Sequence, residues 1–300
     1  MKVLLCGEMD AAEMAVWRTA LAAAMPEATW LDRDAAQSQA NDVQAAVVAN
    51  PAPGSLQGLP RLRLIQSLWA GVDRLLADRT LPAGVPIARM VDPAMSAAMA
   101  ETALWAVLSL HRGFFAYAER QRRGVWRQHV QRRADELQVL VLGQGEMGRA
   151  AAARIAALGY RMAGWRRDGS PLPPLLARAD IVVNLLPLTA DTRGLLDARF
   201  FAALPPCASV VNLGRGAHVV DADLLAALDS GHLRHAVLDV FHVEPLPAGH
   251  PFWSHPRVTV LPHAAAATDP RSAAAVVAVN LRALRDGAAI VHLVDRRRAY

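Results

Sequence analysis

The chain has few cysteines and no long apolar run. Only Cys6 and Cys207 occur in its 300 residues, and their spacing is not that of metal ligands. A reducing cytoplasm is therefore the expected compartment. No segment reaches eighteen consecutive apolar residues, and the apolar start meets Glu8 and Asp10 too soon for a secretory signal. We expect a chain that neither crosses a membrane nor carries an export address.

Nucleic-acid motifs and paired metal ligands are also missing. A formal charge of +5 and a pI of about 10.0 would suit phosphate binding, but the arginines are scattered and no zinc finger or aromatic RNP stretch occurs. One local cluster is interpreted as a solvated helix end or a partner-facing surface: Arg120, Arg122, Arg123, Arg127, Arg132 and Arg133. The histidines other than His263 show no paired ligand spacing. We predict neither nucleic-acid binding nor a metal site.

What is present is enough apolar sequence for two cores. With 53% hydrophobic and 20% charged residues, a chain of this length is expected to form two globular domains. Short apolar runs predict strands at 2–6, 45–49, 64–67 and 87–89, with helices at 11–24 and 72–76. An alanine-rich pattern then predicts one long helix from 92 to about 119, which would cross into the second domain.

The second domain repeats the pattern with longer apolar strands. These are expected at 137–142, 161–164, 181–185, 210–213, 237–240 and 258–261, with a helix at 147–158. Continuous apolar strands alternating with helices indicate a parallel sheet covered on both faces, so the fold is doubly wound. A helix at 269–285 and a strand-like tail at 289–294 would return to the first domain. The expected domains are therefore 1–93 with 268–300, and 94–267.

A glycine-rich turn begins the second domain's first strand-to-helix connection. Gly143 permits the tight turn, Gly145 lets a pyrophosphate approach the backbone, and Gly148 lets helix and strand pack closely. Phosphate charge would then lie at the helix N-terminus. The turn predicts a dinucleotide site with these residues: Gly143, Gln144, Gly145, Glu146, Met147 and Gly148.

The end of the next strand bears on which dinucleotide binds. An acidic residue there usually accepts hydrogen bonds from the ribose of NAD, but this chain has Trp165, Arg166 and Arg167. A guanidinium at Arg166 would attract a 2′-phosphate, which favours NADP(H) over NAD(H). The alternative is that the arginines are solvated and Asp168 is the ribose ligand.

Three polar residues interrupt the chain where successive buried strands end: Arg215, Glu244 and His263. Ligands in such sheets bind beyond the carboxyl ends of the strands. Reduction of a 2-keto acid needs a cation for the carboxylate and a proton donor near the carbonyl oxygen. Histidine suits the donor role, so His263 would protonate the substrate. Glu244 would keep that imidazole charged, while Arg215 would hold the carboxylate. Singly, they could be a loop cation, a helix-start acid and a buried imidazole.

Four motifs carry a resemblance to a known family: Asn-Leu-Gly-Arg-Gly at 212–216, the helix start at 221–228, Leu-Asp-Val-Phe-His-Val-Glu-Pro-Leu-Pro at 238–247 and Pro-His-Ala-Ala at 262–265. The chain resembles the D-isomer-specific 2-hydroxyacid dehydrogenases over almost its whole length. The resemblance implies that Arg215, Glu244 and His263 are catalytic. It also implies a Rossmann cofactor domain inserted into a discontinuous flavodoxin-like substrate domain, and a homodimer formed through the cofactor domain. Further cofactor positions follow from it: Leu186, Pro187, Thr192, Leu213, Gly214, Asp239 and His263.

The segment Ser-Leu-Trp-Ala-Gly-Val-Asp at 67–73 resembles the glyoxylate/hydroxypyruvate reductase A branch of that family. Its loop binds the substrate carboxylate through backbone amides, which implies substrate contacts at Ala70 and Gly71, with Val72 a further candidate, and at the neighbouring Trp69. Trp69 is larger than the residue expected there. It would either narrow the pocket or pack against the cofactor domain.

Together these features predict an NADPH-dependent reductase of a small 2-keto acid, glyoxylate or hydroxypyruvate. Two other functions stay open on the same scaffold. One is a nucleotide-sensing, corepressor-like binding module, and the other is a different dehydrogenase specificity, such as phosphite or formate oxidation. Oxidation of NADPH with a panel of 2-keto acids separates them.

Overall fold

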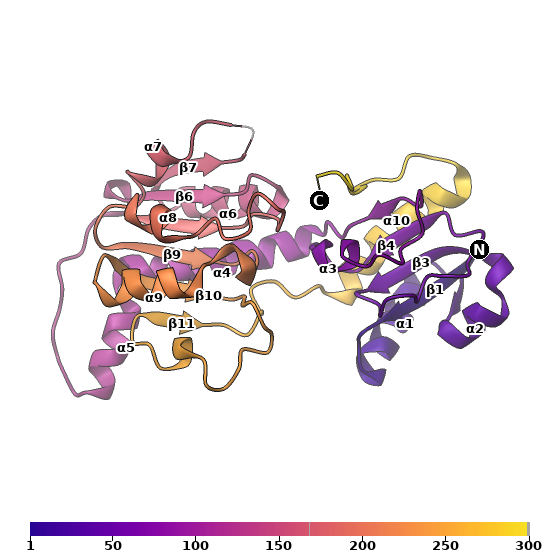
Figure 1. The fold of residues 1–300 in the computed structure, drawn as a ribbon, viewed down its shortest axis with the longest axis horizontal. Helices are drawn as coiled ribbons and strands as arrows, with labels where there is room; N and C mark the ends of the chain where they lie inside the picture. Colours follow the sequence, from indigo (N-terminus) through magenta and orange to yellow (C-terminus); the bar gives the residue numbers. More distant parts are fainter. Residues whose placement is uncertain (168, 299–300) are drawn as a thin grey trace. The chain divides into compact units, whose positions relative to one another are not determined.

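The computed structural model of the chain describes residues 1–167 and 169–298, which form two α/β units. Unit 1 consists of Met1–Met95 and Thr268–Tyr300, and unit 2 of Ser96–Ala267. Each unit has its own parallel sheet (Figure 1).

Unit 1 is built on a five-stranded sheet in the order β2-β1-β3-β4-β5, with every pair parallel. Its strands are β1 (Lys2–Gly7), β2 (Thr29–Leu31), β3 (Val43–Ala49), β4 (Leu64–Ser67) and β5 (Ile87–Ala88). Its helices are α1 (Ala11–Ala24), α2 (Arg33–Ser38), α3 (Asp73–Leu76) and α10 (Pro270–Asp286), with a 3₁₀ turn at Ala40–Asp42. This strand order is that of flavodoxin-like sheets.

Helix α10 shows why the end of the chain belongs to unit 1. Asp269 caps it by accepting from the Arg271 N–H at 2.9 Å. Its buried side chains recur at helical spacing and form one apolar face: Ala273, Ala274, Val277, Ala278, Leu281 and Leu284. Asn280 lies on the same face, and its amide donates to the buried Gln66 of β4 at 2.7 Å. The helix is thus attached to the sheet by apolar packing and by a satisfied polar pair.

The strand expected at 289–294 does not form. The tail lies beside β5, where the Val294 N–H donates to the Ile87 carbonyl at 2.8 Å, but it makes only one isolated antiparallel bridge, Ala88 to Leu293. His292 has a φ of 60°. This left-handed residue interrupts the extended backbone that a regular ladder requires.

Unit 2 contains a six-stranded parallel sheet in the order β11-β10-β9-β8-β6-β7. Its strands are β6 (Gln138–Leu142), β7 (Arg161–Trp165), β8 (Ile181–Asn184), β9 (Ala208–Asn212), β10 (Leu233–Leu238) and β11 (Val258–Val260). Its helices are α5 (Phe114–Arg122), α6 (Glu146–Ala156), α7 (Pro173–Leu176), α8 (Ala198–Ala202) and α9 (Asp221–Asp229), and α4 (Pro93–Arg112) enters it from unit 1. Four residues of β6 alternate between two cores, one on each face of the sheet: Val139, Leu140, Val141 and Leu142.

The long helix expected from 92 to about 119 is broken in the structure. Helix α4 ends at Arg112 and α5 begins at Phe114, because Gly113 takes a φ of 73°. A Cβ there would lie 2.1 Å from Cε1 of His129, so only glycine fits this turn. Among the described helices, α4 alone is long and apolar enough to span a bilayer by length and composition. Its buried side chains pack in the core of unit 2 against β6 and α6, as in the core helix of a globular domain.

Burial also settles the state of one cysteine. Cys6 lies in the core on β1, and burial raises the pKa of its thiol to about 12, with a smaller opposing effect from Arg33. The thiol stays protonated at neutral pH and behaves as a small apolar side chain.

Candidate active site

The glycine turn joins β6 to α6 with the geometry expected of a phosphate-binding turn. Gly143 has a φ of 97°, and a Cβ on Gly148 would lie 1.8 Å from the Gly143 carbonyl oxygen. Both positions therefore require glycine. A Cβ on Gly145 would meet nothing within 4 Å, and Gly145 caps α6 with no side-chain hydrogen bond. This leaves room for an anionic group at the helix N-terminus.

The basic end of β7 lies next to this turn. The Gly143 N–H donates to the Trp165 carbonyl at 2.9 Å, and the Gln144 side chain covers Gly164. Arg166 and Arg167 follow directly, and Arg167 forms an ion pair with Asp191. Asp168, the alternative ribose ligand, lies outside the described residues.

The loop after β8 carries three of the expected cofactor positions. The Thr192 hydroxyl donates to the Pro187 carbonyl at 2.8 Å and accepts from the Thr189 N–H at 2.8 Å. Thr192 is 4% exposed. Its hydroxyl therefore shapes the loop on which Leu186 and Pro187 lie.

The three strands that precede Arg215, Glu244 and His263 end in register. Asn212 of β9 pairs with Leu238 of β10, which pairs with Val260 of β11. The connections after these strands therefore leave the sheet at one edge. This common edge is where ligands of doubly wound sheets bind.

At that edge, Glu244 and His263 are in direct contact. Glu244 Oε2 lies 2.7 Å from His263 Nδ1, and Glu244 Oε1 accepts from the Phe241 N–H at 2.8 Å. The side chain of His263 is 51% exposed. Because Nδ1 faces the carboxylate, Nε2 is the nitrogen left to face a substrate.

His263 is held by a buried carboxylate that supports its turn. The residue has a φ of 54°, and its N–H donates to the Asp239 carbonyl at 2.8 Å. The Asp239 side chain, 1% exposed, accepts from the Ala264 and Ala265 N–H groups at 2.7 and 3.1 Å. Asp239 remains an expected cofactor position. In the structure its carboxylate stabilises the left-handed turn that orients the imidazole.

The Arg215 turn packs against the segment that carries Glu244. A Cβ on Gly216 would lie 1.9 Å from the carbonyl carbon of Phe241, so the two backbones touch. The Arg215 guanidinium donates to the Gly214 carbonyl at 2.8 Å, and the Arg215 carbonyl accepts from the Asn212 amide at 3.0 Å. The structure thus brings the turns of all three predicted catalytic residues to one edge of unit 2.

Several histidines that sequence analysis set aside support this edge. His242 and His250 lie 3.5 and 3.4 Å from the carboxylate of Asp221, at the start of α9. They attach the segment around Glu244 to that helix. His218 is fully buried beside Arg215. Their spacing in the sequence gives no signal, because each acts through a partner on a different loop.

The substrate loop expected at 69–71 belongs to unit 1. The buried Ser67 hydroxyl donates to the Trp69 carbonyl and accepts from the Trp69 N–H, both at 3.0 Å. The indole of Trp69 meets Trp17 of α1 edge to face, with ring centroids 6.2 Å apart. The Trp69 side chain is thereby packed within its own unit, and Ala70 and Gly71 follow it in the loop.

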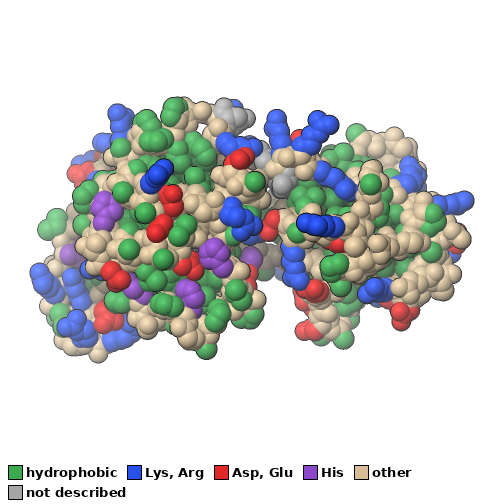
Figure 2. All heavy atoms as spheres, viewed as in Figure 1, with side chains coloured by type: hydrophobic (Ala, Val, Ile, Leu, Met, Phe, Trp, Pro, Cys, Tyr) green, Lys and Arg blue, Asp and Glu red, His purple; other side chains and the backbone are tan. Residues whose placement is uncertain are grey.

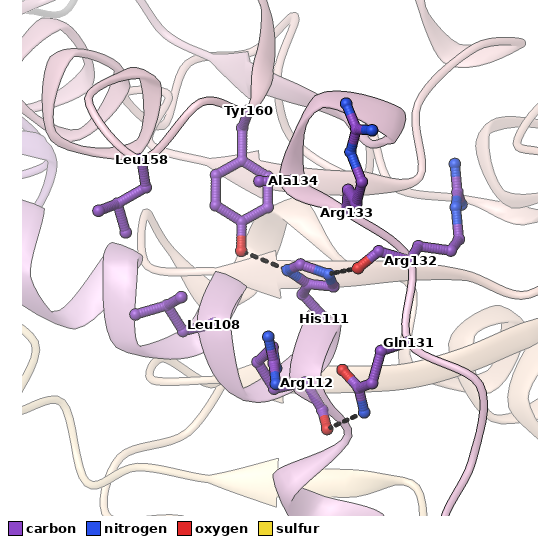
Figure 3. A pocket seen from close by; sticks show the side chains of 9 residues that line it. All are labelled: Leu108, His111, Arg112, Gln131, Arg132, Arg133, Ala134, Leu158 and Tyr160. Carbon is purple, nitrogen blue, oxygen red and sulfur yellow. Dashed lines mark hydrogen bonds between the residues drawn. The ribbon is translucent and has the colours of Figure 1, made fainter.

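A pocket of about 400 Å³ lies elsewhere in unit 2, between α4 and residues 131–134 (Figure 3). His111 accepts from the Tyr160 hydroxyl at 2.6 Å and donates to the Arg132 carbonyl at 2.8 Å. Burial raises the pKa of Tyr160. None of the predicted site residues lines this pocket, and its polar groups serve to anchor the chain after α5.

No group of three His, Cys, Asp or Glu side chains in residues 1–167 and 169–298 could hold a metal ion.

Positive charge is dispersed over the face seen in Figure 2, with a local gathering over α5.

The chain is similar to known proteins over most of its length. Residues 104–265 match the family model described as D-isomer specific 2-hydroxyacid dehydrogenase, NAD binding domain. The chain is 39% identical over 267 residues to glyoxylate/hydroxypyruvate reductase A of Serratia proteamaculans, covering 83% of this chain and 85% of that protein. It is 36% identical over 301 residues to glyoxylate/hydroxypyruvate reductase A of Yersinia enterocolitica, covering 95% and 96%.

Two solved structures of similar proteins superpose on this chain over its full length. A D-isomer specific 2-hydroxyacid dehydrogenase from Xanthobacter autotrophicus Py2, in complex with NADPH and MES, superposes with a TM-score of 0.93 at 38% identity, covering 100% of this chain and 99% of that one. An NADPH-dependent glyoxylate/hydroxypyruvate reductase from Sinorhizobium meliloti, in complex with NADP and sulfate, gives 0.91 at 33% identity with the same coverage.

Proposed function

This chain belongs to the D-isomer-specific 2-hydroxyacid dehydrogenase family, and from that membership we propose that it reduces glyoxylate or hydroxypyruvate with NADPH. The observation that carries the proposal is the 2.7 Å contact between Glu244 and His263. It lies at the sheet edge where the Arg215 turn also ends. The named relatives support the substrate class, and two solved relatives contain NADPH or NADP.

The three residues would divide the chemistry as follows. His263 donates a proton from Nε2 to the carbonyl oxygen as that oxygen gains negative charge. Glu244 fixes the ring through its contact to Nδ1, so that Nε2 faces the substrate. Arg215 binds the substrate carboxylate and polarises the carbonyl, for which a planar guanidinium is suited. NADPH, when bound, supplies the hydride.

The residues at the glycine turn fit a dinucleotide. The open space beside Gly145 and the uncapped N-terminus of α6 suit its pyrophosphate. Arg166 and Arg167 would contact the 2′-phosphate, and the loop of Leu186 and Pro187 would lie over the bound cofactor together with Leu213 and Gly214. Free NAD(H) lacks the 2′-phosphate, so we propose that it binds less tightly.

Replacing Arg166 with Ala is expected to remove most of the preference for NADPH. Loss of a charge-assisted hydrogen bond to the 2′-phosphate should lower kcat/KM with NADPH roughly 10- to 100-fold, while kcat/KM with NADH changes much less. Steady-state kinetics with both cofactors measure this. Arg154→Ala is the control, since Arg154 lies at the other end of α6 beside Glu101. An unchanged NADPH/NADH ratio in Arg166→Ala would assign the 2′-phosphate to another residue.

In unit 2, Arg215 would bind the substrate carboxylate, and in unit 1 the backbone amides of Ala70 and Gly71 are further proposed substrate contacts. Kinetics of the wild type with glyoxylate, hydroxypyruvate and pyruvate, each with NADPH and NADH, test the proposal. The highest kcat/KM should occur with NADPH and one of the first two acids. No NADPH oxidation with any of them would favour the binding module instead.

We also propose a cytoplasmic homodimer formed through unit 2. Residues 123–137 connect α5 to β6, and in this segment Trp126 is 97% and Val130 94% exposed. The His111 contact to Arg132 anchors one end of this segment (Figure 3). Exposed large apolar side chains on an anchored segment are typical of a surface covered by a partner. The chain has only two cysteines, which suits the proposed reducing compartment.

Replacing Trp126 with Glu is expected to convert the dimer to a monomer. A charge at a buried interface position costs several kcal/mol, enough to shift the dissociation constant by two or more powers of ten. Sedimentation velocity over a concentration series measures the change. Val16→Glu, on the exposed side of α1 in unit 1, is the control. A wild type that sediments as a monomer would contradict the homodimer.

A further inference from the structure

His218 is fully buried immediately after the Arg215 turn, and each of its ring nitrogens faces a different loop. The Arg215 N–H donates to Nδ1 at 3.2 Å, and Nε2 lies 3.3 Å from the Pro187 carbonyl. One loop carries the proposed substrate-binding guanidinium. The other carries the proposed cofactor contacts Leu186 and Pro187.

These partners determine the tautomer. A backbone N–H can only donate, so Nδ1 must carry a lone pair, and a carbonyl can only accept, so Nε2 must carry the proton. The Asn184 amide supports this arrangement by donating to Nδ1 at 2.8 Å, while its own oxygen accepts from the Leu186 N–H at 3.2 Å. His218 is therefore neutral with its proton on Nε2.

The ring is also closely packed. A Cβ on Gly214 would lie 3.2 Å from Cε1 of His218, so the imidazole packs directly beneath the backbone that precedes Arg215. Asn184 and Asn212 are both fully buried and hydrogen-bonded to each other at 2.9 Å. Asn212 also accepts from the Gly214 N–H at 3.2 Å. Buried networks of this kind fix loop backbones, because a broken member leaves an unpaired polar group.

We propose that His218 is a positioning residue that sets the Arg215 turn through Nδ1 and the cofactor loop through Nε2. This inference rests on the proposed function, in which these loops bind keto acid and NADPH. The two nitrogens should therefore have different kinetic effects. Loss of the Nδ1 contact should raise KM for the keto acid, and loss of the Nε2 contact should raise the Kd for NADPH.

Two near-isosteric variants make the separation testable. The Asn oxygen in His218→Asn can replace the Nδ1 acceptor but cannot reach Pro187. The Gln amide in His218→Gln can replace the Nε2 donor but leaves the Arg215 N–H without its acceptor. We expect His218→Asn to raise the Kd for NADPH roughly 3- to 10-fold, and His218→Gln to raise KM for the keto acid roughly 10- to 100-fold. Each variant should change the constant measured for the other ligand by no more than about twofold.

NADPH binding is measured by fluorescence titration without substrate, and KM by NADPH oxidation. His232→Gln is the matched control, because His232 also bonds a carbonyl in unit 2, that of Phe201 at 2.9 Å, but lies before β10 and not at the carboxyl ends of the strands, where both loops begin. This control should lower the melting temperature without changing the Kd for NADPH or KM for the keto acid. The proposal is overturned if the two His218 variants shift both ligands equally, or if they lower only the melting temperature.

The titration also separates this inference from the proposed reaction. If the wild type binds NADPH but reduces no keto acid, the proposed substrate is wrong. The contrast between His218→Asn and His218→Gln in NADPH affinity then still supports or overturns the positioning role. If the wild type does not bind NADPH, both proposals are overturned.

Discussion

His263→Asn is expected to lower kcat by roughly 10²- to 10⁴-fold, the usual contribution of a positioned general acid, and to leave the Kd for NADPH within about twofold. Asparagine is preferred to alanine because position 263 has a φ of 54°, a left-handed conformation that asparagine tolerates and alanine does not. The loss of rate should then report the missing proton donor and not a distorted turn. Stopped-flow measurement of NADPH oxidation, with binding measured separately, gives both quantities.

Glu244→Gln provides the matched comparison. A glutamine oxygen can still accept from the Phe241 N–H, and the side chain can still reach Nδ1, but it carries no charge. We expect a loss of kcat smaller than that of His263→Asn, because the imidazole is still present and loses only the neighbouring negative charge. If His263→Asn retained wild-type turnover, the proton would have to come from another group and the proposed mechanism would be wrong.

The positions of these residues could be predicted from the sequence because parallel strands share an edge. Apolar runs identified β9, β10 and β11, and the doubly wound pattern required their carboxyl ends to lie together. The structure confirms the two parallel-sheet units, and the register of Asn212, Leu238 and Val260 explains why the following polar residues meet. The contact between Glu244 and His263, nineteen residues apart, depends on the course of a loop that no periodicity describes.

Two predicted elements differ from the structure because one residue in each has a left-handed backbone conformation. Alanine-rich helical spacing continues through residue 119, so Gly113 gave the only local sign that the helix would stop, and the close approach of His129 that requires glycine there is a tertiary contact. In the tail, apolar residues suggested a strand, but the left-handed His292 allows a single bridge. In both places tertiary contacts overrode local preference.

The supporting polar residues were not predictable in the same way. His218 and Asn184 lie in different strand-to-loop connections and become partners only because β8 and β9 are neighbours. The spacing of a histidine along the sequence bears on metal ligation, but it gives no information about a buried, hydrogen-bonded ring. The hydrogen bonds of Asp239 were not predictable either, because its carboxylate accepts from backbone amides that follow a different strand, β11.

Arg215→Met is expected to lower kcat/KM for the keto acid by roughly 10²- to 10³-fold, comparable to removal of one preorganised donor from a developing oxyanion. Methionine retains much of the side-chain volume and removes the charge and the hydrogen-bond donors. The backbone of the turn should survive, because His218 and Asn212 hold its N–H and carbonyl without using the guanidinium. The Kd for NADPH should therefore change by less than about threefold, within the range of one lost weak contact.

Arg215→Lys distinguishes charge from geometry at this position. An ammonium group keeps the positive charge but cannot bind a carboxylate in the bidentate manner of a guanidinium. If orientation of the keto acid is the main contribution, Lys should recover only a small part of the activity lost in Met, with KM still raised. Near-complete recovery in Lys would mean that Arg215 acts as a point charge, and an unchanged KM in Met would mean that another group binds the substrate carboxylate.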